Sequence, residues 1–141
     1  MIVLDTNVVS ETMRRVPSAA VIGWLNRQLR SELYLCAPVV AELSYGIARL
    51  EESRLKQTLL LFYRQTIDED FERRVLPFDA SAAEVYGELV AKLKSEGKVI
   101  DVIDAMIAAI ALSNAATLAT RNLAHFAHTG LTLVDPFSDS H

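Results

Sequence analysis

Residues 1–7 read MIVLDTN, a short run of apolar side chains that ends in an acid. A run such as Ile2, Val3 and Leu4 is typical of a buried β-strand in an α/β protein. Asp5 follows directly, and a buried carboxylate is costly unless a cation or hydrogen-bond donors meet it. What accompanies Asp5 is therefore the first question about this chain.

Four similar runs follow along the sequence, with helical patterns between them. The five runs are IVLD (2–5), ELYLCA (32–37), RVLPF (74–78), TLAT (117–120) and LTLV (131–134). Strands that alternate with helices predict an α/β fold with a mainly parallel sheet flanked by helices. The pattern leaves the order of the strands open.

Capping residues and apolar spacing place the helices. Ser18 is expected to cap a helix over 18–29, and Pro38 to begin one that runs to Leu50. Further helices are predicted around 55–63, over 81–97 and from Asp101 onwards. In the fourth of these, SAAE (81–84) has the form of a capping box, and Gly97 is a natural terminator.

Composition bounds the class of protein. The chain has 141 residues, 51% of them hydrophobic, without repeats or a linker-like stretch, so we expect one domain over 1–141. The longest apolar stretch, AMIAAIAL (105–112), is well short of the about 18 residues of a membrane span, and no signal peptide is apparent. The single cysteine, Cys36, fits a reducing cytoplasm and a packed core thiol rather than a nucleophile. The net charge of −4 argues against simple coating of nucleic acid, but not against an enzyme that engages it locally.

Three acids stand in apolar surroundings near strand ends or helix starts: Asp5, Glu42 and Asp104. Each has a plain alternative, since Asp5 suits a helix cap, Glu42 suits a helix dipole and Asp104 suits a satisfied buried acid. Parallel strands present their carboxyl ends at one edge of the sheet, where Thr120, Arg121 and Asn122 also leave a strand. If the acids converge there, their repulsion calls for a cation, and oxygen ligands favour Mg²⁺ or Mn²⁺. His125 and His128 are interpreted as a solvated surface pair, because no Cys/His spacing indicates zinc.

Five segments then resemble a known family, in order and over essentially the whole chain. They are MIVLDTNVVSE, APVVAELSYGIARL, GKVIDVIDAMIAAIAL, TLATRNLAHF and VDPF. This set resembles the PIN-domain nucleases, and among them the VapC/FitB-like toxins of bacterial toxin–antitoxin pairs. The resemblance implies a PIN-like five-stranded parallel sheet with an acidic pocket at its carboxyl edge.

The resemblance also implies roles for individual site residues, an activity and partners. Asp5, Glu42 and Asp104 match the family's three acids, Thr6 matches the small polar residue after the first acid, and the segment 120–122 matches its T-R-N/D motif. Family members cleave RNA with Mg²⁺ or Mn²⁺, pair as homodimers and are inhibited by a small antitoxin protein encoded beside them. Thr6 and Thr120 are then expected to hydrogen-bond the carboxylates.

One departure concerns position 122, where the family often has a fourth acid and this chain has Asn122. Asparagine occurs there in the family too, but it leaves a second metal ion open. Asp101 lies on the same helical face as Asp104 and would partly compensate, although the reading as an N-cap is favoured. Arg121 is expected either to neutralise phosphate charge or to form a surface ion pair.

Two other functions are compatible with parts of the sequence, and the apolar segment 50–71 indicates a binding surface. Haloacid-dehalogenase-like phosphatases also place Asp after the first strand, but they need a second Asp where this chain has Asn7. A catalytically weak PIN-like module that binds RNA or protein is the other alternative, supported by Asn122 alone. The apolar segment 50–71 is expected, with the helix before it, to form a groove for an antitoxin tail; the alternative is that its side chains are all core.

Overall fold

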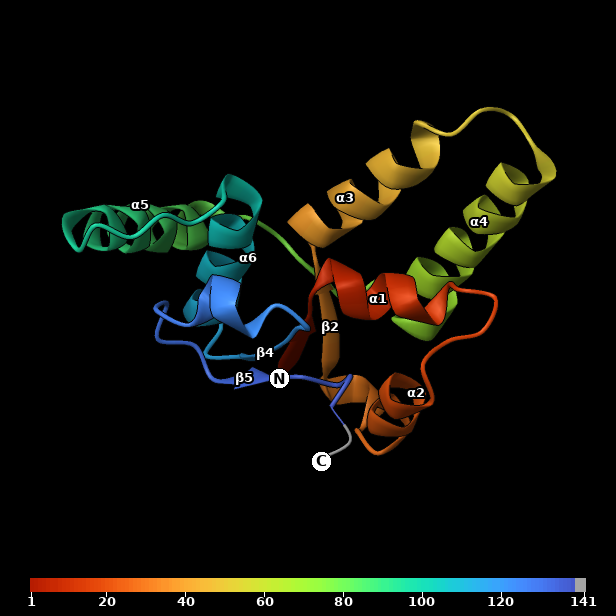
Figure 1. Ribbon diagram of the computed structural model, residues 1–141, viewed down its shortest axis with the longest axis horizontal. Coiled ribbons are helices and arrows are strands. Elements are labelled where there is room, and N and C mark those ends of the chain that lie inside the picture. The colour runs from red at the N-terminus through yellow and green to blue at the C-terminus, as the bar shows by residue number, and fades with distance from the viewer. Residues whose placement is uncertain (139–141) are drawn as a thin grey trace.

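The structure, a computed structural model that describes residues 1–138, contains a five-stranded parallel sheet (Figure 1). The strand order is β3-β2-β1-β4-β5, and every neighbouring pair is parallel. The strands are β1 (Ile2–Leu4), β2 (Leu33–Cys36), β3 (Val75–Leu76), β4 (Thr117–Ala119) and β5 (Leu133–Val134). Each falls inside one of the five apolar runs, so the predicted fold class is confirmed.

Within residues 1–138, six α-helices cover the two faces of this sheet (Figure 1). One side carries α1 (Thr6–Thr12), α2 (Ala19–Asn26), α3 (Ala37–Ala48) and α4 (Arg54–Gln65), and the other carries α5 (Ala80–Ser95) and α6 (Val102–Ser113). The described residues also contain three short helical turns: η1 (Arg30–Glu32), η2 (Thr66–Asp70) and η3 (Leu123–Phe126). The helices change sides because the crossovers from β1 through β3 run one way across the sheet, and the crossover to β4 runs back.

The central strand β1 is where the strand order reverses. It pairs with β2 on one side, with Ile2 opposite Leu33, and with β4 on the other, with Leu4 opposite Ala119. Ligands of open α/β sheets bind beyond the carboxyl ends of the strands at such a switch point. Asp5 follows β1 at this point, and its backbone N–H still donates to Ala119 at 2.9 Å.

The core lies between the sheet and the helices. Val3, Leu35 and Leu118 from the sheet are fully buried, and so are Ile107 and Ile110 of α6. Burial of the Cys36 thiol raises its pKa to about 12, with the negative charges of Asp5 and Glu42 acting in the same direction. Cys36 is therefore a core thiol, as its surroundings in the sequence predicted.

The predicted caps are confirmed at two helices and wrong at a third. Ser18 accepts a hydrogen bond from the N–H of Val21, and Asp101 accepts one from the N–H of Ile103. The capping box at Ser81 is wrong, because α5 already begins at Ala80 and its cap is Asp79, which accepts from Ala82 at 2.9 Å. Asp79 is the better cap because its carboxylate also favours the positive end of the helix dipole.

Within residues 1–138, no helix combines the length and apolar character that a membrane crossing requires.

Candidate functional site

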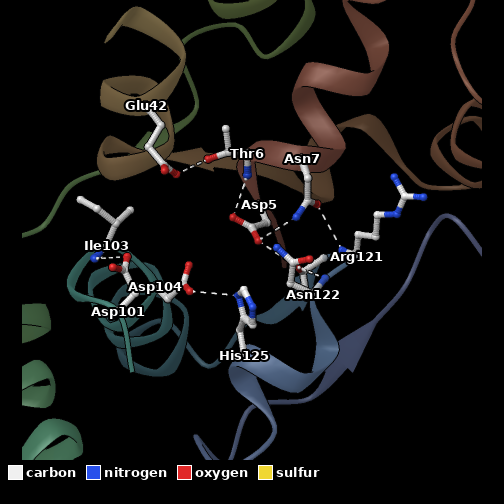
Figure 2. Close-up of polar contacts among 11 residues, drawn as sticks. Asp5, Thr6, Asn7, Glu42, Asp101, Ile103, Asp104, Arg121, Asn122 and His125 are labelled. Atoms are coloured by element: carbon white, nitrogen blue, oxygen red, sulfur yellow. Dashed lines mark hydrogen bonds and ion pairs between the residues drawn. The ribbon is translucent and has the colours of Figure 1, made fainter. Parts of the chain in front are cut away.

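The hydrogen-bond donors around Asp5 answer the question raised by its position. Asp5 is only 4% exposed. Its carboxylate accepts from the Thr6 N–H at 2.8 Å, from Thr120 Oγ1 at 2.7 Å and from Asn7 Nδ2 at 3.3 Å (Figure 2). Three donors compensate much of the cost of burying a charge, and they fix the direction of the carboxylate without a cation.

The turn after β4 is tied to the same place. Thr120 is fully buried, and its hydroxyl oxygen accepts from the Asn122 N–H at 3.0 Å while it donates to Asp5. Asn7 Oδ1 accepts from the Arg121 N–H at 3.2 Å. Asn7 thus binds both Asp5 and the turn. Sequence reasoning gave Asn7 no role, although its place in LDTN was the available signal.

Glu42 approaches from the first turns of α3. Its Oε1 accepts a hydrogen bond from Thr6 Oγ1 at 2.5 Å (Figure 2). Thr6 begins α1 directly after Asp5, so its backbone N–H binds one acid and its hydroxyl binds another. Glu42 is exposed to solvent, and its carboxylate is therefore held less firmly than that of Asp5.

Asp104 lies in the first turn of α6, on the opposite side of the sheet from α3. Burial is the main reason that the pKa of Asp104 lies above its usual range, and the charge of Asp5 is the next. Asp101 and Glu42 add to this shift, while His125 opposes it. Asp104 is therefore close enough to the other acids to be repelled by them.

The three carboxylates come from the residue after β1, from α3 and from α6, and they border one space (Figure 2). Their chemistry fits Mg²⁺ or Mn²⁺, since all donors are oxygens and the negative charges repel one another. Across residues 1–138, however, no three His, Cys, Asp or Glu side chains are gathered tightly enough to hold an ion as they stand. The three carboxylates therefore do not form a closed ligand set in this arrangement.

The remaining residues expected at the site lie in different places relative to the three acids. Asp101 is an N-cap, and Asn122 lies in the turn next to Thr120, with its side chain drawn toward the shared space in Figure 2. The Arg121 guanidinium points away from the acids and lies 4.6 Å from the ring centroid of Phe137, a cation–π contact. His125 was expected to be only a solvated surface residue, but its Nδ1 lies 3.3 Å from Asp104 Oδ2.

An apolar groove borders the acidic site on one side. It measures about 510 Å³ and is lined by residues of α1, α3 and α4 and of the turn after α1, including Thr6, Glu42, Ile47, Leu55 and Leu59. The predicted groove is thus present, and the alternative that the side chains of segment 50–71 are all core is wrong. Leu55 is 62% exposed, and α4 has no fully buried side chain.

Comparison with known proteins identifies the family of this chain. The sequence profile of the PIN domain matches residues 2–130. The chain is 38% identical to "VapC ribonuclease Y4jK" of Sinorhizobium fredii, over 97% of this chain and 98% of the relative. It is 37% identical to "Toxin FitB" of Neisseria gonorrhoeae, over 99% of this chain and all of the relative.

A solved structure agrees with these relatives. The structure titled "Structure of FitAB bound to IR36 DNA fragment" superposes with a TM-score of 0.92 at 36% identity, covering 100% of this chain and 99% of that one. Profile, relatives and fold lead to one assignment. The chain belongs to the PIN domain family, in its VapC- and FitB-like branch.

Proposed function

We propose that this protein is a metal-dependent ribonuclease and the toxin of a toxin–antitoxin pair. The observation that supports the proposal is the arrangement of Asp5, Glu42 and Asp104, which come from three separate segments and border one space at the carboxyl edge of the sheet without yet being close enough to share an ion (Figure 2). Relatives at 37–38% identity bear the names of a ribonuclease and a toxin, which supports the same activity here.

The contacts of each acid suggest its role as a metal ligand. Asp5, held by three donors, is the fixed ligand, and Glu42 and Asp104 approach from the helices. Thr6 orients Glu42 and Thr120 orients Asp5, so both threonines position ligands. Mg²⁺ or Mn²⁺ held by these three acids would supply an activated water and would polarise the scissile phosphate. Hydrolysis by water leaves a 5′-phosphate and a 3′-hydroxyl and does not use the 2′-hydroxyl as nucleophile.

The activity is tested with purified protein and single-stranded RNA. We expect cleavage with Mn²⁺ or Mg²⁺, products with 5′-phosphate ends, and no cleavage in EDTA. Cleavage that persists in EDTA would contradict the metal-dependent mechanism. Metal-independent RNA binding without any cleavage would favour the alternative of a catalytically weak module.

We further propose that the apolar groove receives a segment of the antitoxin. The groove contains Thr6 and Glu42, so an occupant would lie against the acidic site and block it. Arg14 and Arg15 also line the groove, and Leu55 exposes an apolar surface there. An amphipathic segment with apolar and acidic side chains complements this lining.

Two helical glycines provide a matched test of the groove. Gly46 lines it, Gly87 lies on α5, and a Cβ at either position meets nothing within 4 Å. Gly46→Phe should fill the groove and release the toxin from the small protein encoded beside it, while Gly87→Phe should not. Growth during co-expression reads out the difference. Equal protection of both variants would remove the groove from the proposal.

The family resemblance also supports a homodimer in solution. Light scattering at micromolar concentration should give twice the mass of the chain, which is 15.6 kDa. A monomer under these conditions would contradict this part of the proposal.

A further inference from the structure

A second, smaller cavity is lined in part by His125, the residue that contacts Asp104. It measures about 180 Å³, and its lining includes the apolar side chains of Leu93, Ile100 and Ala124. Ligand pockets for drug-sized molecules are typically ~300–1,000 Å³, so this one suits a single flat ring system. It lies between the loop that joins α5 to α6 and the turn η3.

The rest of the lining brings basic side chains together. Lys98, His125 and His128 all border this cavity, on a chain whose net charge is −4. The ammonium of Lys98 lies 3.6 Å from Glu96 Oε2, and both side chains are 37% exposed. Ion pairs this exposed contribute little, so Lys98 is available to a phosphate oxygen.

His125 lines the cavity and also contacts the acidic site. Its Nδ1 lies 3.3 Å from Asp104 Oδ2, and the imidazole is 58% exposed. Its backbone is held because its N–H donates to the Asn122 carbonyl at 3.0 Å and the next residue, Phe126, is 1% exposed. One side chain therefore contacts an acid of the proposed site and also lines the cavity, so a ligand in the cavity would lie next to that site.

We propose that this cavity binds the nucleoside next to the scissile phosphate of the RNA, an inference that rests on the proposed ribonuclease function. Proteins recognise unpaired bases by stacking them on aromatic or histidine rings and against apolar side chains. His125 and Ile100 provide such surfaces, and Lys98 and His128 face the flanking phosphate. The cavity then contributes to the choice of cleavage site.

The histidines allow binding to be observed without catalysis. The imidazole C–H signals of His125 and His128, assigned with His→Gln variants, are followed by NMR at fixed pH in EDTA. The probe is a five-nucleotide single-stranded RNA of mixed sequence. Both signals should shift, while the indole signal of the buried Trp24 stays in place. Unshifted imidazoles, with or without binding elsewhere, would overturn the inference.

Variants test the same cavity. Lys98→Ala should weaken RNA binding about tenfold, the effect of losing one hydrogen bond to a charged group. Lys94→Ala, an exposed lysine of α5 outside the cavity, should not. Ile100→Trp should fill the cavity and change the sites cleaved in a random RNA pool. Equal affinities of the two lysine variants, or an unchanged cleavage pattern in a folded Ile100→Trp, would contradict the inference.

The outcomes distinguish this inference from the function on which it rests. Cleavage with Mn²⁺ by a protein whose imidazole signals ignore RNA would overturn the nucleoside pocket and leave the ribonuclease in place. Shifted imidazoles without cleavage would support the pocket and contradict the ribonuclease.

Discussion

The two halves of the acidic site are built in different ways. In the strand half, Asp5 is buried and accepts three hydrogen bonds, one of them from the fully buried Thr120. In the helix half, Glu42 has a hydrogen bond from Thr6, and Asp104 has a contact with the exposed His125. The strand half is thus fixed by the fold, and the helix half is more weakly held.

This difference indicates which carboxylates a bound cation would stabilise most. The donors of Asp5 already stabilise its charge, so the strand half is organised for binding in advance. Asp104 has a raised pKa because it is partly buried and repelled by Asp5, so a nearby positive charge stabilises it most.

Removing a ligand charge from either half should greatly reduce RNA cleavage. A unit charge pair ~4 Å apart is worth ~4 kcal/mol at an effective dielectric of ~20, before desolvation is subtracted. Asp5→Asn and Asp104→Asn should therefore each lower the rate of RNA cleavage up to about a thousandfold without unfolding the protein. Fluorescent RNA assays and circular dichroism measure both properties. Glu84→Gln, an exposed acid on α5, is the control, and substantial cleavage by either variant would contradict the assignment.

The hydrogen bond from Thr120 to Asp5 should contribute to both stability and metal binding. Thr120→Val removes the 2.7 Å donor to Asp5 and leaves a buried carboxylate short of a partner. We expect unfolding free energy to fall by about 1–3 kcal/mol and metal affinity or activity to fall by about 10–100-fold. Urea unfolding and calorimetry with Mn²⁺ measure the two effects. Thr117→Val, at the start of β4, is the control, and equal results for both variants would show that the Asp5 contact is dispensable.

A charge added at position 122 should tighten the site. Asn122→Asp places a carboxylate in the turn that holds Thr120, so Mn²⁺ affinity should rise about tenfold for each ~1.4 kcal/mol gained. Calorimetry at low ionic strength is the measurement, and the circular dichroism spectrum should not change. If the variant binds Mn²⁺ no better than the parent, Asn122 is only a turn residue.

The smallest effect concerns stability without metal. Because the pKa of Asp104 is raised, the folded protein binds this proton more readily than the unfolded chain. Stability should therefore fall as the pH rises from the ordinary aspartate pKa through the raised one. In EDTA, Asp104→Asn should be slightly more stable than the parent at neutral pH, and this advantage should vanish near pH 3. Thermal melts across pH test this, and a variant less stable at neutral pH would contradict it.

Local sequence was sufficient for most of the fold. All five apolar runs contain strands, and Ser18 and Asp101 cap the helices predicted for them. Such features depend on a few adjacent side chains, which is why spacing and capping preference predict them. The cap of α5 was misplaced by two residues, because Asp79 and Ser81 both suit the role and only the path of the chain after β3 selects between them.

The apolar runs predicted the α/β class and the strand segments, and the family resemblance supplied the three acids. The strand order, the contact of Asn7 with the turn after β4, the contact of His125 with Asp104 and the direction of Arg121 toward Phe137 became visible only in the folded chain. They depend on residues that are far apart in the sequence or on how a side chain packs. The Thr120–Asp5 hydrogen bond joins residues 115 positions apart, and such a contact exists only when β1 and β4 lie side by side in one register.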